Sequence, residues 1–162
     1  MNTSMTETEI KLEEARIQLE MAMSSENIKK PAIIRSCING FISSARSVTF
    51  TMQQESGSSE KFKKWYEGKQ EQMKTIPLLK FFNDQRVISI HQRSVKPNQR
   101  FLKIEKVEQG GRVIGTGGTV MFYEFEGINK IIPGDSGNVF RLCNEYYDYL
   151  QQLVNDWLEV MR

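Results

Sequence analysis

"PAIIRSCINGFISSARSVTFTMQQE", residues 31 to 55, is the stretch that decides the fold. Its apolar residues recur every three or four positions, and they are Ile34, Cys37, Ile38, Phe41, Ala45, Val48 and Met52. This spacing places them on one face of a helix. Pro31 suits the first helical turn, because the N–H group it lacks would be unpaired there in any helix. The stretch therefore predicts a long helix that buries one face, and its small residues Ser36, Gly40, Ser43, Ser44 and Ser47 indicate a second face open to a close helix neighbour.

The flanking segments carry the same helical pattern. Residues 5–23 place apolar side chains among glutamate, lysine and arginine, and these are Ile10, Ala15, Ile17, Leu19, Ala22 and Met23. They predict an amphipathic helix with an acidic face. On the other side, Ser59 can cap a third helix over residues 60–75, with a buried stripe of Phe62, Trp65, Tyr66 and Met73. Pro77 interrupts the pattern, and residues 77–95 resume it as a fourth helix.

The pattern changes after Pro97. "RFLKIEKVE" (100–108) alternates apolar and charged residues, and "TVMFYEFEG" (119–127) is rich in β-branched and aromatic residues. We expect an antiparallel hairpin at about residues 100–126, with two strands or with a short third one in the glycine-rich stretch between them. Residues 139–161 then return to helical spacing, with apolar residues from Val139 to Met161. The chain is predicted to be a single, mainly α domain over residues 1–162: a bundle of four or five helices with a hairpin inserted before the last one.

Composition excludes some classes of function. The 162 residues contain 22 Lys and Arg against 20 Asp and Glu, a net charge of +2, so any nucleic acid must meet a local basic patch. Cys37 and Cys143 lie inside apolar helical patterns and are expected to be buried thiols, with no metal or other cofactor. The acidic residues of the first helix indicate a solvated face. No apolar run reaches membrane-spanning length and no signal-peptide pattern begins the chain, so we expect a cytoplasmic protein that does not bind membranes.

Two glycine-containing motifs carry letters associated with catalysis or phosphate binding. GDSG (134–137) resembles the surroundings of a serine-protease nucleophile, but those enzymes need a strand-rich scaffold. We interpret it as a turn followed by a helix start, with Asp135, Ser136 or Asn138 as the cap. "GGRVIGTGG" (110–118) lacks the lysine–serine ending of a P-loop and is interpreted as a hairpin connector.

Arg86 and His91, in "RVISIH" (86–91), are the candidate catalytic residues. A separation of five residues on a helix means about 140° of rotation and about 7.5 Å of rise, so the two side chains flank one broad face and can share a ligand. On spacing alone, the histidine of a mainly apolar helix is more often a hydrogen-bonded interior or interface residue.

Residues 32–94 resemble the HEPN superfamily of helical-bundle proteins. The likeness lies in the order of features: a helix with many small residues, a helix with Phe62 and Trp65, a "PLLKFF" segment (77–82), and then an Arg-x4-6-His motif. Active members are generally metal-independent ribonucleases that work as dimers, with the motifs of two subunits facing each other. The resemblance implies that Arg86 neutralises the scissile phosphate and that His91 is the general acid or base when a ribose 2′-hydroxyl attacks.

Two functions follow from this resemblance, and the sequence leaves both open. The first is an RNA- or nucleotide-binding homodimer, a ribonuclease of toxin or defence type, with a phosphate-contacting surface extended by Lys80, Arg93, Lys96, Arg100 and Lys103. The second is a non-catalytic dimeric interaction module whose hairpin recruits a protein partner. Val87 favours the second, because active members usually carry a polar residue after the arginine, and valine cannot hydrogen-bond a sugar or phosphate.

Overall fold

The computed structural model describes residues 4–91, 95–104, 108–110, 112–113 and 117–162 of the chain. Within them the polypeptide forms five α-helices, which are α1 (Glu7–Met23), α2 (Pro31–Ser56), α3 (Glu60–Lys74), α4 (Pro77–His91) and α5 (Val139–Met161). The predicted helices are confirmed, with Pro31 in the first turn of α2 and Ser59 accepting a hydrogen bond from the backbone N–H of Phe62 at the start of α3. The mainly helical fold follows from the periodicity of the sequence.

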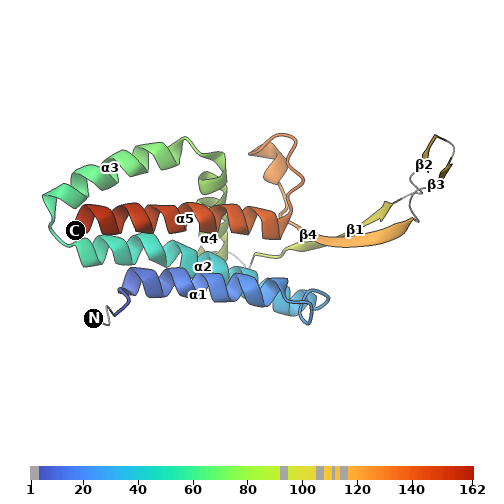
Figure 1. The fold of residues 1–162 in the computed structure, drawn as a ribbon, viewed down its shortest axis with the longest axis horizontal. Coiled ribbons are helices and arrows are strands. Elements are labelled where there is room, and N and C mark those ends of the chain that lie inside the picture. Colours follow the sequence, from blue (N-terminus) through green and yellow to red (C-terminus); the bar gives the residue numbers. More distant parts are fainter. Residues whose placement is uncertain (1–3, 92–94, 105–107, 111, 114–116) are drawn as a thin grey trace.

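The helices form a bundle whose long members lie side by side. In Figure 1, α1, α2 and α5 run along the long axis, α3 lies over α5, and α4 crosses behind them. The predicted apolar face of α2 is buried throughout, and α5 buries Leu142, Cys143, Leu150, Leu153, Val154 and Trp157 against it. Phe81 and Phe82 of α4 complete this core. Buried aromatic and aliphatic side chains from all five described helices thus hold the bundle together.

Helices α1 and α2 form an antiparallel pair (Figure 1). A methyl group on Gly40 would come within 2.8 Å of the Gln18 side-chain oxygen of α1, so the Gln18 side chain packs directly over this glycine. At the other end, the Glu55 carboxylate of α2 accepts hydrogen bonds from the backbone N–H groups of Glu7 and Thr8. Because the first N–H groups of a helix lack partners within it, Glu55 caps α1 from the neighbouring helix.

The predicted apolar stripe of α1 is partly wrong. Ala15, Leu19 and Ala22 are buried, but Ile17 and Met23 are exposed. Thr8 and Leu12 take part in the buried face instead. Apolar residues of α1 lie on more than one side of the helix, so their spacing alone could not decide which side faces α2.

The predicted hairpin is confirmed, and it begins and ends two residues earlier than the predicted range of about 100–126. Strand β1 (Asn98–Ile104) pairs antiparallel with β4 (Gly118–Glu124) in an unbroken register from Asn98 opposite Glu124 to Ile104 opposite Gly118. The short strands β2 (Glu108–Gln109) and β3 (Arg112–Val113) pair with each other in a separate two-stranded sheet. Figure 1 shows the β1–β4 ribbon projecting beyond the helices. We call this ribbon, residues 98–104 and 118–124, the arm.

Both strands of the arm are anchored where they leave the bundle. Asn39 of α2 donates to the carbonyl of Val95 at 2.7 Å and accepts from the N–H of Val95 at 2.9 Å, just before β1. Tyr123 of β4 donates to the carbonyl of Ile28 at 2.8 Å. Hydrogen bonds from two sides therefore fix the direction in which the arm leaves the bundle.

The GDSG segment is a turn followed by a helix start, as predicted. Asp135 accepts the N–H of Gly137 at 2.7 Å, and Asn138 caps α5 by accepting the N–H of Arg141 at 3.0 Å. Gly137 has a φ of 73°, and a side chain there would come within 2.7 Å of Ile128. Ile128 lies in a 3₁₀ turn (Ile128–Lys130) that the sequence did not predict.

Candidate functional site

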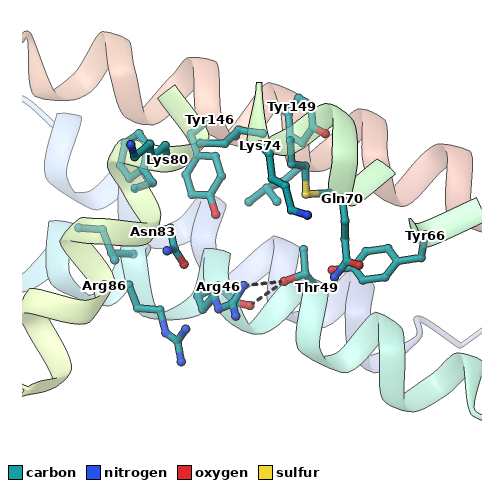
Figure 2. A pocket seen from close by; sticks show the side chains of 15 residues that line it. Arg46, Thr49, Tyr66, Gln70, Lys74, Lys80, Asn83, Arg86, Tyr146 and Tyr149 are labelled. Atoms are coloured by element: carbon teal, nitrogen blue, oxygen red, sulfur yellow. Dashed lines mark hydrogen bonds between the residues drawn. The ribbon is translucent and has the colours of Figure 1, made fainter. Parts of the chain in front are cut away.

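A pocket of about 630 Å³ lies among α2, α3, α4 and α5. Its volume is within the range of small-molecule binding sites. The residues with polar side chains that line it are Arg46 and Thr49 of α2, Tyr66, Gln70 and Lys74 of α3, Lys80, Asn83 and Arg86 of α4, and Tyr146 and Tyr149 of α5. In Figure 2 the polar ends of several of these side chains, from different helices, turn toward a common space.

The charge of the pocket has a single sign. Arg46, Lys74, Lys80 and Arg86 line it, and none of the described residues that line it is acidic. Lys74 forms an ion pair of 2.6 Å with Glu71, outside the pocket lining. Within the described part of the chain, no carboxylate pairs with Arg46 or Arg86, and the polar contact of Arg46 is a long one of 3.5 Å to the Thr49 hydroxyl. Among the described residues, two guanidinium groups without a carboxylate partner therefore line one recess, an arrangement whose charge and geometry suit an anion.

Tyr146 is fixed in the pocket by aromatic packing. Its ring stacks on Phe82 with a centroid distance of 4.4 Å and meets the edge of Phe41 at 6.2 Å. Burial raises the pKa of Tyr146 to about 12, although the positive charges of Arg46 and Arg86 act in the opposite direction. The hydroxyl therefore stays protonated at neutral pH, and it points toward Asn83 and Arg46 in Figure 2. It is a preoriented hydrogen-bond donor beside the two arginines.

A smaller groove of about 350 Å³ adjoins the pocket along α2. Ser43, Ser47 and Phe50 line it, together with Arg46 and Arg86, which also line the pocket. Phe50 is 58% exposed, so its ring is available to a ligand. The two arginines thus lie at the boundary between the two cavities, where one extended ligand would contact both.

The predicted site residues are distributed over different parts of the fold. Arg86 and Lys80 both line the pocket. His91 is the last residue of α4, and its side chain and Arg93 lie outside the described residues, so the convergence of Arg86 and His91 stays a prediction.

The remaining predicted basic residues lie outside the pocket. Lys96 is exposed just before β1, and Lys103 is exposed on β1. Arg100 is also on β1 and forms an ion pair of 2.6 Å with Glu124 across the arm. The structure therefore brings Lys80 and Arg86 together and separates both from Arg100 and Lys103, which project with the arm (Figure 1).

Sequence reasoning missed most of the pocket. Arg46 was surrounded by the small residues of α2, and Tyr66 and Tyr146 were assigned to buried apolar stripes. A signal was present for the tyrosines, because a buried tyrosine usually directs its hydroxyl to a polar partner or to solvent. No pattern within one helix indicates that residues of four helices meet.

The described residues contain neither a metal-ligand cluster nor a membrane-spanning helix. No group of three or more His, Cys, Asp or Glu side chains there is arranged to hold a metal ion. None of the helices in this part of the chain is long and apolar enough to cross a membrane. Cys37 and Cys143 are both buried free thiols, as predicted.

The fold and the site define a class of protein: an α-helical bundle with a cationic, tyrosine-lined pocket and a projecting β arm. The sequence profile of the family described as Bacteriophage lambda protein ea47 matches residues 6–104, which is more than half of the chain. The protein belongs to this family. The matched region contains α1 to α4 and β1, and therefore Arg46 and Arg86. Comparisons with curated proteins and with solved structures found no match.

Proposed function

We propose that the protein binds RNA or a nucleotide through phosphate groups held between Arg46 and Arg86. One observation carries this proposal: four cationic side chains line the pocket, and no acidic side chain among the described residues lines it with them. Arg16 and Arg141, elsewhere in this chain, each pair with two carboxylates instead. An unpaired arginine pair costs electrostatic repulsion unless an anion binds there, and planar guanidinium groups match phosphate oxygens in pairs.

The two adjoining cavities favour a ligand with several nucleotides. A strand crossing from the pocket to the groove would contact Arg46 and Arg86 with its backbone, and the exposed ring of Phe50 would be available to stack a base. Tyr146 would donate a hydrogen bond to a phosphate or ribose oxygen.

Under this proposal the chain is also a candidate ribonuclease of HEPN type, acting without a metal as a homodimer of toxin or defence type. His91 would be the acid or base, and Arg86 would stabilise the charge that develops on the phosphate. Val87 is 43% exposed next to Arg86, where active HEPN proteins usually have a polar residue, so binding without cleavage is the alternative outcome.

The test compares the purified protein with an Arg86→Ala/His91→Ala variant in an EDTA-containing incubation with mixed RNA. Cleavage by the parent alone, leaving 2′,3′-cyclic phosphate ends, would support the ribonuclease proposal. A parallel binding assay with fluorescently labelled single-stranded RNA would use Arg46→Ala, with Arg35→Ala as a matched control. Arg35 is an exposed arginine of α2 that lines neither cavity.

We expect Arg46→Ala to weaken RNA binding about tenfold or more, since hydrogen bonds to charged groups contribute about 1.5–3 kcal/mol. Arg35→Ala should bind like the parent, and binding should weaken as salt rises. Equal affinity of the parent and Arg46→Ala would contradict the proposal.

The second candidate function is a dimeric interaction module that binds a protein partner. The observation that favours it is the exposure of Phe101, Leu102 and Val120 on the arm, at 64%, 57% and 46%. Exposed apolar side chains gathered on one projecting element are typical of contact surfaces. Under this candidate, His91→Ala would alter dimerisation or stability and leave RNA unchanged.

A further inference from the structure

The two strands of the arm have outer edges of very different composition. β1 contains Arg100 and Lys103, and charged side chains of this kind discourage a further strand from pairing. β4 reads Gly-Thr-Val-Met-Phe-Tyr-Glu, so it has no charge from Gly118 to Tyr123 and no proline. Thr, Val, Phe and Tyr are also residues that favour strands. The arm is therefore protected on the β1 side and unprotected on the β4 side.

The outer edge of β4 is open along its length. Among the described residues, it has one bridge beyond its pairing with β1, between Glu124 and Asn138, at the base of the arm. No strand pairs with residues 118–123 on that side within the described part of the chain, and the ribbon projects beyond the helices (Figure 1), with Tyr123 buried against Phe140 at its base. A two-stranded ribbon is only marginally stable in water, and further strands make it stable.

The side chains of the arm are also apolar on both faces. Residues opposite each other share a face of an antiparallel pair, so Phe101 and Met121 lie on one face while Leu102 and Val120 lie on the other. Three of these four are exposed, and Met121 is half-buried. Each face therefore exposes apolar side chains beside a charged residue of β1, Lys103 on the first face and Arg100 on the second.

We propose that β4 is a self-association edge, at which the β4 strands of two copies of this chain pair antiparallel. The product is a two-fold symmetric sheet of four strands in the order β1, β4, β4 of the second copy, β1 of the second copy. This inference is independent of the ligand of the pocket. It also places the subunit contact on the arm, whereas the HEPN resemblance implies a contact through the helix that carries Arg86 and His91.

Symmetry favours a second copy at this edge. An antiparallel strand pair is compatible with two-fold symmetry, so one uncharged sequence satisfies both sides of the contact. Charge then selects β4 over β1 as the strand that pairs, because pairing through β4 leaves Arg100 and Lys103 of both copies on the outer strands, whereas pairing through β1 would bring them together.

The size of the contact sets the expected affinity. Seven strand residues extend about 23 Å. An edge contact of this length buries less than the roughly 800 Å² per partner of a stable interface. The dimer is therefore expected to form reversibly, and its fraction should rise with protein concentration.

The test is sedimentation-velocity centrifugation of the full chain over a wide range of protein concentration. The variant is Val120→Lys, and the matched control is Leu102→Lys, since Leu102 is the partner of Val120 across the arm and is also exposed. Both substitutions remove an exposed aliphatic side chain and add the same charge, but only Val120→Lys places it on the open edge. Circular dichroism melts would establish that both variants keep the folded bundle.

We expect the parent and Leu102→Lys to dimerise alike, and Val120→Lys to remain monomeric. A mixture of Val120→Lys with Val120→Glu should recover dimers, because opposite charges then meet at the symmetric edge. The proposal is overturned if the parent stays monomeric at every concentration, if the two lysine variants dissociate equally, or if the mixture stays monomeric. It is likewise overturned if Val87→Lys on α4 abolishes the dimer while Val120→Lys preserves it.

Discussion

The indole N–H of Trp157 in α5 donates a hydrogen bond of 2.8 Å to the hydroxyl of Ser56, the last residue of α2. The same hydroxyl donates to the carbonyl of Met52 at 2.7 Å, so the buried serine links two long helices. Both side chains are almost fully shielded from water. Loss of a hydrogen-bond partner at this buried position should lower the free energy of unfolding, because water cannot replace the partner.

Replacing Ser56 by alanine should lower the free energy of unfolding by about 1–3 kcal/mol, because the Trp157 N–H is then left without its partner. Urea titration followed by tryptophan fluorescence would measure the change. Ser47→Ala is the control, since its hydroxyl bonds only to the carbonyl of Ser43 on the surface of the same helix. Equal stability of Ser56→Ala and the parent would show that the link contributes nothing.

Glu55 provides a second test, because its carboxylate caps α1 from outside the helix. Glu55→Gln should destabilise the protein by about 1 kcal/mol, since it removes a negative charge from the start of α1 and leaves one acceptor oxygen. Thermal unfolding monitored by circular dichroism would detect the loss. Glu60→Gln, in the first turn of α3, is the comparison, because Glu60 contacts only the exposed Lys63. Equal melting temperatures of Glu55→Gln and Glu60→Gln would contradict this expectation.

The buried thiols should be unreactive in the folded protein. Burial raises the pKa of the Cys37 thiol and raises that of Cys143 well above its ordinary value, so neither forms the reactive thiolate near neutral pH. Ellman's reagent should label neither cysteine quickly in buffer and both in urea. Rapid labelling of two thiols without denaturant would contradict the buried positions of both.

The pair between Lys69 of α3 and Asp156 of α5 predicts a dependence of stability on pH. Hydrogen bonds from Lys69 and Gln152 lower the pKa of the Asp156 carboxyl. A carboxyl whose pKa is lower in the folded state stabilises the fold above its unfolded pKa of about 3.9, and this stabilisation is lost as pH falls through the folded value.

Asp156→Asn should therefore be less stable than the parent at pH 7, by no more than about 1 kcal/mol for a pair near the surface. The two proteins should become equally stable at the acidic end of a urea titration series. A difference that stays constant down to pH 2 would show that the charge of Asp156 is not its cause.

The succession of elements was predictable because it depends on local signals. Pro31, Ser59 and Pro77 mark helix starts, and the spacing of apolar residues marks the helices between them. Local signals fail where two faces of a helix look alike, as in α1, whose exposed Ile17 resembles a core residue. The β1–β4 pairing was also predictable, because alternating residues on both sides of a glycine-rich stretch favour a hairpin.

The pocket was only half predictable. Arg86 and Lys80 belong to one helix and were found by their sequence context, whereas Arg46 and Tyr146 belong to other helices and are separated from them by more than 30 positions along the chain. Their meeting depends on how α2, α4 and α5 pack. No acidic residue is among the described residues that line the pocket. This feature results from how the helices pack, so no single segment of the sequence could indicate it.

The arm begins and ends at one place, since Asn98 and Glu124 lie opposite each other where it joins the bundle. A short turn between these two positions would close the chain without displacing α4 or α5, because strand partners are already about 5 Å apart. Evolution can therefore change the arm as a separate unit, because both of its ends join the bundle at one point. Mutation can lengthen the arm, change its charge or delete it while the helices around Arg46 and Arg86 keep their geometry. The contacts that the arm makes and the ligand that the pocket binds can therefore change independently.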